Sequence, residues 1–221
     1  MIKPDALIIF DCDGVLIDSE PIASRTLAFA LQDAGISITP EESLRVFTGH
    51  SEPHIRHMCA EQYGLDDVDG TFSRWHIALK QAFATQLQPM AEMLELVAGL
   101  AQPKCVASNS RVARLEQSLG NTPLWAHFAP HVYSAEMVTR PKPAPDLLLH
   151  CALKMGVEPS ACVMIDDSPH GIAAAKAAGM ASIGFVDPND PRPGRHEVLA
   201  ASGADVVVHG TRGLAALLPV A

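Results

Sequence analysis

The sequence predicts an α/β protein with a doubly wound parallel sheet and an all-helical domain inserted after the first strand. Short, uninterrupted apolar runs recur along the chain, as expected of strands that are buried on both faces of a parallel sheet. Helical patterns alternate with these runs over most of the chain, which indicates βαβ units. Between residues 18 and 88 the alternation stops and only helical patterns occur, which indicates an insertion.

The elements of the main domain begin with the apolar run ALIIF at residues 6–10. Further runs of this kind, each a predicted strand, lie at residues 104–107, 131–133, 162–165, 181–186 and 205–208. Predicted helices lie at residues 91–100, 111–119, 145–155 and 171–178, and a predicted loop, DPNDPRPG, lies at residues 187–194. These elements predict one α/β domain formed by residues 1–17 and 89–221.

The insertion, residues 18–88, is predicted to be a helical cap. Its helical patterns lie at residues 21–34, 41–47, 52–63 and 72–83. Helix ends and turns are expected at its glycines, Gly35, Gly49, Gly64 and Gly70. A chain of 221 residues is long enough for one large domain with such an insertion.

Composition and charge restrict the classes of function. With 48% hydrophobic and 19% charged residues, the chain is typical of a folded globular protein. The net charge of −9 argues against a nucleic-acid partner, because that binding requires clustered Lys and Arg. Five cysteines without a CxxC pair are typical of reduced thiols in a cytosolic protein. Without a signal-peptide pattern or an apolar run of roughly 20 residues, a soluble cytoplasmic protein with no membrane partner is expected.

Two carboxylates follow the first predicted strand. Asp11 and Asp13 are two positions apart, and residues with this spacing in an extended chain point to the same side. The carboxyl ends of parallel strands are where ligand crevices form. Two acids crowded at such a place require a cation or a shared proton. The alternative without function is a solvated acidic turn.

A second acidic pair, Asp166 and Asp167, follows the predicted strand at residues 162–165. If this strand lies beside the first, up to four carboxylates face one crevice. Oxygen-rich sites of this kind suit Mg²⁺, which binds a few protein oxygens together with water and a substrate phosphate. A structural role also fits, because Asp167 or Ser168 can cap the helix that follows, and the two roles are compatible.

A hydroxyl group and a lysine lie between the two acidic pairs in the sequence. Ser108 and Asn109 end a predicted strand in front of a helix, where a hydroxyl and free backbone N–H groups can hold a phosphate. Alone this signal is weak, because Ser and Asn commonly cap helices. Lys142 lies between Pro141 and Pro143, which limit backbone freedom. We therefore expect a fixed ammonium group beside the carboxylates and a phosphate.

In order and spacing, these residues resemble the four motifs of the haloacid dehalogenase (HAD) superfamily. The motifs are Asp11-x-Asp13-Gly-Val, Ser108-Asn109, Lys142-Pro-x-Pro and Asp166-Asp167-Ser168-x-x-Gly171. The alanine-rich stretch from Gly171 to Gly179 strengthens the resemblance, which spans almost the whole chain. A helical insertion directly after the first motif is similar to the cap of the β-phosphoglucomutase-like and phosphoglycolate phosphatase-like branch. The resemblance implies a Rossmann-like HAD core.

The resemblance implies catalytic roles for four motif residues. Asp11 would attack phosphorus and form an aspartyl phosphate, which divides one difficult displacement into two. Asp13 would protonate the leaving oxygen and then take a proton from the hydrolytic water. Ser108 and Lys142 would hold the oxygens of the transferred phosphoryl group. The implied enzyme is a phosphoric monoester hydrolase.

The resemblance also implies a Mg²⁺ cofactor. Its ligands would be the carboxylates of Asp11 and Asp167 and the backbone carbonyl of Asp13, while Asp166 would support the metal indirectly or through water. Within the superfamily, dehalogenases and phosphonate hydrolases lack the second aspartate of the first motif. The presence of Asp13 therefore excludes both reactions.

Hydrolysis is favoured over two alternatives. Sugar phosphomutases of this branch carry a histidine in the helix after the first motif and an arginine near the first turn of the cap, and the matching stretches here, DSEPIA and TGHSE, have neither. A phospho-accepting signalling module is the alternative from another class, since receiver domains also place an aspartate, an acidic pair, a hydroxyl and a lysine around magnesium. Those domains are shorter, lack a cap and carry the acidic pair before the phosphorylated aspartate, the reverse of the order here.

The resemblance implies a small phosphorylated metabolite as substrate, either a sugar phosphate or a phosphorylated sugar acid. The pattern Gln117-Ser-Leu-Gly120 before Trp125 and Phe128 is most similar to the 6-phosphogluconate phosphatase type. A monomer or a weak dimer is expected. The cap histidines share one predicted helix face, where a surface role is preferred to a metal site: His50, His54 and His57. Substrate-binding residues are predicted in the cap and on the core side: Arg45, Gly49, His50, Ser51, Glu20, Asn109 and Arg111.

Overall fold

The computed structural model describes residues 2–3 and 5–218, which form two compact units. One unit is the helical segment of residues 19–87. The other contains the described residues of segments 1–18 and 88–221 and carries every strand of the sheet. Among the described residues, none of the helices combines the length and the apolar character that a membrane span requires.

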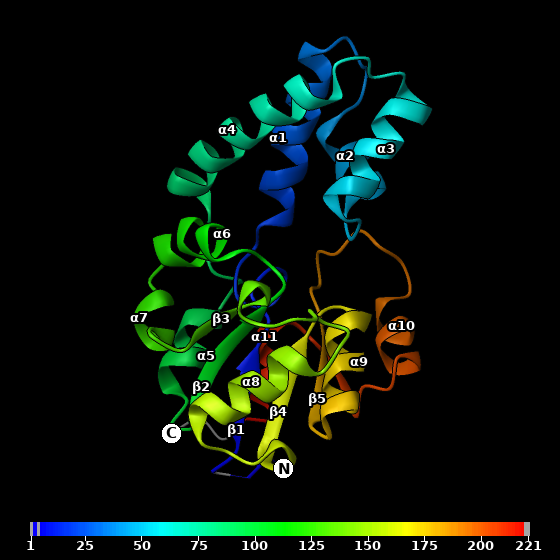
Figure 1. Ribbon diagram of the computed structural model, residues 1–221. Helices are drawn as coiled ribbons and strands as arrows, with labels where there is room; N and C mark the ends of the chain where they lie inside the picture. The colour runs from blue at the N-terminus through cyan, green and yellow to red at the C-terminus, as the bar shows by residue number, and fades with distance from the viewer. Residues whose placement is uncertain (1, 4, 219–221) are drawn as a thin grey trace. The chain divides into compact units, whose positions relative to one another are not determined.

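The α/β unit is built on a six-stranded sheet whose neighbouring strands are all parallel. The strand order is β3-β2-β1-β4-β5-β6, and Figure 1 shows the sheet between layers of helices. The strands are β1 Leu7–Phe10, β2 Lys104–Ser108, β3 Val132–Ser134, β4 Cys162–Asp166, β5 Ala181–Val186 and β6 Val206–His209. The predicted fold class, a doubly wound α/β sheet, is therefore confirmed.

The helices of this unit connect and cover the strands. They are α5 Met93–Gly99, α6 Val112–Gln117, α7 Trp125–Phe128, α8 Asp146–Met155, α9 Pro169–Ala178, α10 Arg195–Ala201 and α11 Gly210–Ala215. Short 3-10 segments are η1 Leu119–Asn121, η2 Ala135–Met137 and η3 Pro159–Ala161. Sequence patterns did not predict α7, α10 or α11, which have four, seven and six residues, fewer than the about 11 over which a helical period is recognisable. The similarly short α5 and α6 were predicted, within longer patterns at residues 91–100 and 111–119.

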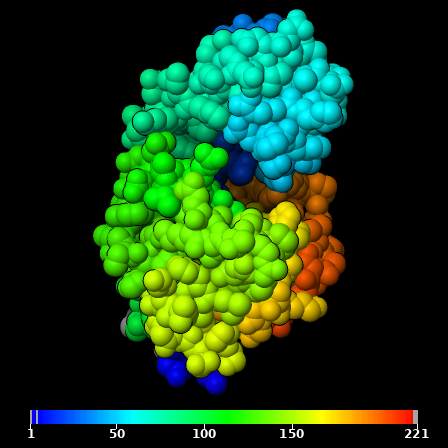
Figure 2. Space-filling model, in the orientation of Figure 1, coloured from blue at the N-terminus to red at the C-terminus, as the bar shows by residue number. Residues whose placement is uncertain are grey.

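Side chains of β1 alternate between the two faces of the sheet. Leu7 and Ile9 join a buried cluster with residues of α8 and α9, such as Leu148 and Ala175. On the opposite face, the ring of Phe10 contacts the ring of Phe128 of α7 edge to face, with centroids 5.6 Å apart. Atoms of α8 and α9 cover the near face of the sheet in the space-filling view (Figure 2). A strand with both faces covered has a sequence of consecutive apolar residues, as β1 does.

The register of β1 and β4 brings the two acidic motifs to one edge of the sheet. Phe10, the last residue of β1, lies opposite Ile165 of β4. One residue further, the backbone N–H of Asp11 donates to the carbonyl oxygen of Ile165 at 2.9 Å. Both strands therefore end at the same level, and the side chains that follow them share the carboxyl edge of the sheet.

The helical unit consists of α1 Glu20–Asp33, α2 Pro40–Phe47, α3 Glu52–Tyr63 and α4 Val68–Gln86. The α1 helix contacts both α2 and α4, and the indole N–H of Trp75 in α4 donates to Thr26 Oγ1 in α1 at 3.0 Å. A capping box starts α2, since Thr39 and Glu42 each bind the other's backbone N–H. A helix end or a turn was expected at Gly70, and it lies at a helix end, although inside the helix and not before it. Gly70 lies in the first turn of α4, where its N–H donates to the capping carboxylate of Asp67.

Candidate active site

The ammonium group of Lys142 joins the two acidic motifs. Its Nζ donates to Asp11 Oδ1 and to Asp166 Oδ2, both at 2.7 Å, and to the carbonyl oxygen of Ala107 at 3.0 Å. A lysine has three N–H donors, so all three are engaged. Lys142 is 5% exposed and Asp166 is fully buried. The ion pair is therefore shielded from solvent and holds Asp11 in one orientation.

Asn109 holds Lys142 in place. Its side-chain amide donates to the carbonyl oxygen of Lys142 at 2.9 Å, and its Oδ1 accepts the backbone N–H of Lys142 at 3.0 Å. The nitrogen and the oxygen of the side-chain amide are thus both bound to the backbone of Lys142. The contacts found for Asn109 fix the position of the lysine, and its predicted contact with substrate stays a prediction.

Three carboxylates converge into a set that fits a divalent cation. Ligand oxygens of Asp11, Asp166 and Asp167 lie within 4.8 Å of one another. Hard oxygen donors at this spacing suit Mg²⁺ or a similar ion. Gly14 leaves the space for this arrangement, because a Cβ added there would lie 3.0 Å from the carboxylate of Asp167. Its φ of +79° also favours glycine.

The charges of this set leave room for further positive charge. Burial raises the pKa of Asp11 well above its ordinary value; Lys142 opposes that rise, and the carboxylates of Asp166 and Asp167 add to it. Burial also works against the charge of Lys142, but the ion pairs with Asp11 and Asp166 outweigh burial and raise the pKa of Lys142. Three carboxylates around one ammonium group are what a divalent cation would balance.

The carboxylate of Asp13 points to different partners from that of Asp11. Ser110 Oγ donates to Asp13 Oδ2 at 3.1 Å, and Arg114 Nη2 lies 3.5 Å from Asp13 Oδ1. Both partners follow β2, the strand that ends in Ser108. Asp13 does not belong to the cluster of three converging carboxylates found among the described residues. This separation is compatible with a proton-transfer role for Asp13, in which only its backbone faces a metal.

Other predicted residues are found at or near this edge. Ser108 is 2% exposed, and its hydroxyl oxygen accepts the backbone N–H of Ser110. Ser168 caps α9 through the N–H of Gly171, so the predicted capping role coexists with the acidic site. Arg111 is exposed, with its Nε 3.9 Å from Glu136. Residues Glu20, Arg45, Gly49, His50 and Ser51 belong to the helical unit.

Sequence patterns missed a group of charges on the loop between β5 and α10. Arg192 Nη2 lies 3.3 Å from Asp167 Oδ2 and 2.6 Å from Asp190 Oδ2. Arg195 pairs with Asp190 as well, and it donates to the backbone carbonyl of Asp167. The sequence pattern predicts a loop here and no ion pairs. The signal that pointed to Lys142, a cation between prolines, is also present at Pro191-Arg192-Pro193.

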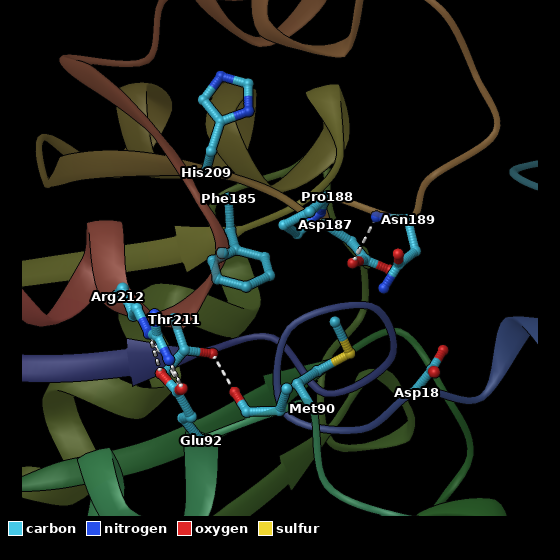
Figure 3. Close-up of a pocket in the computed structure, with 12 residues that line it drawn as sticks. Asp18, Met90, Glu92, Phe185, Asp187, Pro188, Asn189, His209, Thr211 and Arg212 are labelled. Atoms are coloured by element: carbon cyan, nitrogen blue, oxygen red, sulfur yellow. Dashed lines mark hydrogen bonds and ion pairs between the residues drawn. The ribbon is translucent and has the colours of Figure 1, made fainter.

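A cavity of about 290 Å³ opens beyond the carboxyl ends of β5 and β6 in the same unit (Figure 3). Burial, followed by the nearby carboxylate of Asp187, raises the pKa of Asp18 in its wall. Thr211 Oγ1 donates to the carbonyl oxygen of Ala91 at 2.6 Å. None of the residues predicted for the site is among those lining this cavity in the described chain, which are Asp18, Met90, Ala91, Glu92, Phe185, Asp187, Pro188, Asn189, His209, Gly210, Thr211 and Arg212.

Comparison with known families and curated proteins agrees with this geometry. The family described as haloacid dehalogenase-like hydrolase matches residues 8–185. A 6-phosphogluconate phosphatase of Escherichia coli (strain K12) is 30% identical over 185 residues, which cover 83% of this chain and 84% of the relative. Hexitol phosphatase B of the same strain is 32% identical over 197 residues, covering 83% and 86%.

Solved structures are also similar over nearly the full length. A haloacid dehalogenase-like protein from Agrobacterium tumefaciens superposes with a TM-score of 0.84 at 34% identity, covering 96% of this chain and 97% of that one. A HAD family hydrolase from Deinococcus radiodurans, solved with bound phosphate and sodium, has a TM-score of 0.85 at 28% identity, covering 99% of both chains.

The chain belongs to the haloacid dehalogenase-like hydrolase family. The superfamily predicted from the four motifs is therefore confirmed, and so is its Rossmann-like core. Curated relatives of this chain are named as phosphatases, which agrees with the predicted class of enzyme, a phosphoric monoester hydrolase.

Proposed function

We propose that the protein is a Mg²⁺-dependent phosphatase that hydrolyses a small phosphorylated metabolite through a phosphate ester of Asp11. In this proposal residues 1–17 and 89–221 are the catalytic core and residues 18–88 are a cap. The observation that carries the proposal is the convergence of Asp11, Asp166 and Asp167 oxygens within 4.8 Å, with the ammonium group of Lys142 buried across the first two.

Asp11 is suited to be the nucleophile. Its Oδ1 accepts a hydrogen bond from Lys142 Nζ at 2.7 Å, which holds the carboxylate in one orientation. The other carboxylate oxygen would then attack phosphorus. An Asp11 oxygen forms a bond to phosphorus while the bond from phosphorus to the ester oxygen breaks. The products of this first step are the alcohol and an aspartyl phosphate.

Asp13 is suited to move protons in both steps. It gives a proton to the leaving ester oxygen and later takes one from the water that attacks the aspartyl phosphate. The second step releases inorganic phosphate and restores the Asp11 carboxylate. Ser110 and Arg114 hold the Asp13 carboxylate between these events, at 3.1 Å and 3.5 Å.

The remaining motif residues are suited to stabilise charge on the transferred group. Mg²⁺, held by Asp11, Asp167 and the backbone carbonyl of Asp13 with Asp166 in support, would supply positive charge at the phosphoryl oxygens. Ser108 would hold the same oxygens from the end of β2, and Lys142 would do so by exchanging one of its three present hydrogen bonds for a phosphoryl oxygen. Fixed donors of this kind supply most of the catalysis in phosphoryl transfer.

The substrate class rests on similarity to named enzymes. Relatives of this chain are named as phosphatases of 6-phosphogluconate, fructose 1-phosphate and hexitols, which supports a sugar phosphate or a phosphorylated sugar acid. The names of these curated relatives do not favour the phosphomutase alternative, and family membership argues against a signalling module. The contacts with substrate that were predicted stay predictions for all these residues: Glu20, Arg45, Gly49, His50, Ser51, Asn109 and Arg111.

The test is a phosphate-release screen with the purified full chain. The panel contains 6-phosphogluconate, fructose 1-phosphate, hexitol phosphates and phosphoglycolate, each with Mg²⁺ and with EDTA. Release is expected for at least one compound, only with the metal. Asp11→Asn should reduce kcat by about 10³-fold or more, because the nucleophile is lost. Asp5→Asn, an exposed substitution in the same unit, is the control. Turnover by Asp11→Asn at the parent rate would refute the mechanism.

A further inference from the structure

The loop that leaves β5 brings a guanidinium group onto a carboxylate of the acidic cluster. Arg192 Nη2 lies 3.3 Å from Asp167 Oδ2, and the two side chains are 23% and 20% exposed. Asp167 is one of the three converging carboxylates. The pair is therefore largely withdrawn from solvent, and solvent screens it less than it screens a surface pair.

Asp190 fixes this guanidinium group from the other side. Its carboxylate accepts Arg192 Nε at 2.8 Å and 3.1 Å and Arg192 Nη2 at 2.6 Å, and its Oδ1 also accepts the backbone N–H of Arg192. Arg195 Nε lies 3.3 Å from the same carboxylate. A planar guanidinium group bound in this way has little freedom to turn. Arg192 Nη2 is shared between two carboxylates, one inside the acidic cluster and one outside it.

A fixed positive charge at this place must oppose the binding of a second cation to Asp167. Two like charges a few ångströms apart repel each other by an energy that depends on their separation and on the local dielectric. The Arg192 guanidinium is held by Asp190, so it cannot move far when a metal arrives. Asp190 reduces the repulsion, because its negative charge lies directly against the guanidinium.

We propose that Arg192 is a resident counter-ion of Asp167 that lowers the affinity of the acidic cluster for a divalent metal, and that Asp190 limits this effect. The inference depends on one part of the proposed function, namely that Asp167 is a ligand of the metal. Its consequence is that metal alone binds weakly. A phosphate ester adds negative charge to the same place, so metal and substrate bind more tightly together than either binds alone.

The test measures Mg²⁺ binding to the metal-free full chain by calorimetry, without substrate. Arg192→Gln is expected to lower the Kd for Mg²⁺ by about tenfold, because one fixed positive charge is removed next to the site. Asp190→Asn is expected to raise the Kd by about threefold, because the guanidinium groups then lack their counter-charge. A purely structural role of this loop would shift both constants in the same direction.

The matched control is Arg212→Gln, which removes the same charge from an exposed pair with Glu92 in the same unit. Its Kd should stay within about twofold of the parent value, because exposed charges are strongly screened. An Arg192→Gln variant with unchanged or weaker Mg²⁺ binding, or two variants that shift in the same direction, would overturn the inference. A parent protein that binds no Mg²⁺ would refute the proposed function together with the inference. Normal binding by the parent with no change in Arg192→Gln would refute the inference alone.

Discussion

At the scale of single residues, Lys142 determines whether the acidic site can exist in a folded protein. Its ammonium group donates to Asp11, Asp166 and the carbonyl oxygen of Ala107, and it is 5% exposed. Without it, the buried carboxylates of Asp11 and Asp166 would lose the ammonium group that pairs with both. Removing one partner of a buried ion pair is far more costly than breaking a pair at the surface.

Lys142→Met should therefore destabilise the protein by about 3 kcal/mol in EDTA at pH 8. The loss should be smaller at pH 5. Burial raises the pKa of Asp11 in the folded protein. The protonated Asp11 carboxyl therefore stabilises the folded state at a pH below the ordinary carboxyl pKa, and this stabilisation is lost as the pH rises through the raised pKa of Asp11. The charge of Lys142 opposes this loss in the parent and is absent from the variant, so the difference between the two proteins widens with pH.

The measurement is urea unfolding of both proteins at the two pH values. Lys154→Met, which removes an exposed lysine at the end of α8, should change the free energy of unfolding by less than about 0.5 kcal/mol at either pH. A loss that is equal at pH 5 and pH 8 would contradict the electrostatic explanation.

At the scale of elements, the start of α9 shows how closely a helix can approach the site. Ser168 caps the helix, and the backbone N–H of Ser168 donates to Asp166 Oδ1 at 2.8 Å. Gly171 passes so close that a Cβ there would lie 1.7 Å from Asp166 Oδ2. The same oxygen accepts the ammonium group of Lys142. The first turn of α9 and the acidic site therefore share one carboxylate.

Gly171→Ala should displace Asp166, although alanine normally favours a helix. We expect a loss of stability of about 2 kcal/mol from overpacking. We also expect a fall in kcat/KM of about 10²-fold, because Asp166 and Lys142 would shift by a fraction of an ångström or more. Unfolding in urea and phosphate release on the same preparations measure the two effects.

Gly120→Ala is the matched control, since its added Cβ would lie 3.7 Å from the nearest atom, an ordinary contact. That variant should be neutral or stabilised by up to about 1 kcal/mol. If Gly171→Ala behaved in the same way, the packing of α9 against Asp166 would not constrain the site.

The strands and most helices were predictable from sequence patterns, and three short helices were not. Continuous apolar runs such as ALIIF gave every strand within about two residues, because a parallel strand is buried on both faces. Helices α7, α10 and α11 have seven residues or fewer, too few for a clear period, and were not predicted. Helices α5 and α6 are as short and were predicted as parts of longer patterns, at residues 91–100 and 111–119. The predicted helix at residues 72–83 starts later than α4 does, because the helix begins at Val68 and contains Gly70 in its first turn.

At the site, the grouping of the acidic side chains could be predicted, but their hydrogen-bonding and ion-pair partners from loops could not. The carboxyl ends of β1 and β4 place Asp11, Asp166 and Asp167 together, and strand adjacency is enough to predict this. Partners that come from loops, such as Arg192, depend on a backbone path that no local pattern specifies. The contact of Asn109 with Lys142 could not be predicted for the same reason, because it joins residues far apart in the sequence.

At the scale of the whole molecule, the chain forms two compact units, and the helical unit has buried side chains packed on one another. In the helical unit, Phe72 is fully buried, its ring contacts Trp75 with centroids 5.4 Å apart, and the guanidinium carbon of Arg56 lies 4.3 Å from its centroid. This core is built from one continuous segment, residues 19–87. A segment with its own core can open without unfolding the sheet.

Phe72→Ala should therefore act mainly on residues 19–87. Loss of a buried phenylalanine is worth about 3–5 kcal/mol, so amide hydrogen exchange in this segment should accelerate by about 10²-fold or more. Amides of β1, β2 and β4 should change by less than about tenfold. Mass spectrometry of exchanged peptides measures both. Equal acceleration in the two units would mean that the chain unfolds as one cooperative body.

The central place of β1 in the sheet has a consequence for synthesis of the protein. Leu7–Phe10 emerges from the ribosome well before its neighbour on one side, Cys162–Asp166, which follows much later in the sequence. Until then one edge of β1 has no hydrogen-bonding partner, and the nascent polypeptide has the first aspartates without the second pair. An unfinished chain is thus expected to be inactive, and the exposed strand makes it a substrate for chaperones.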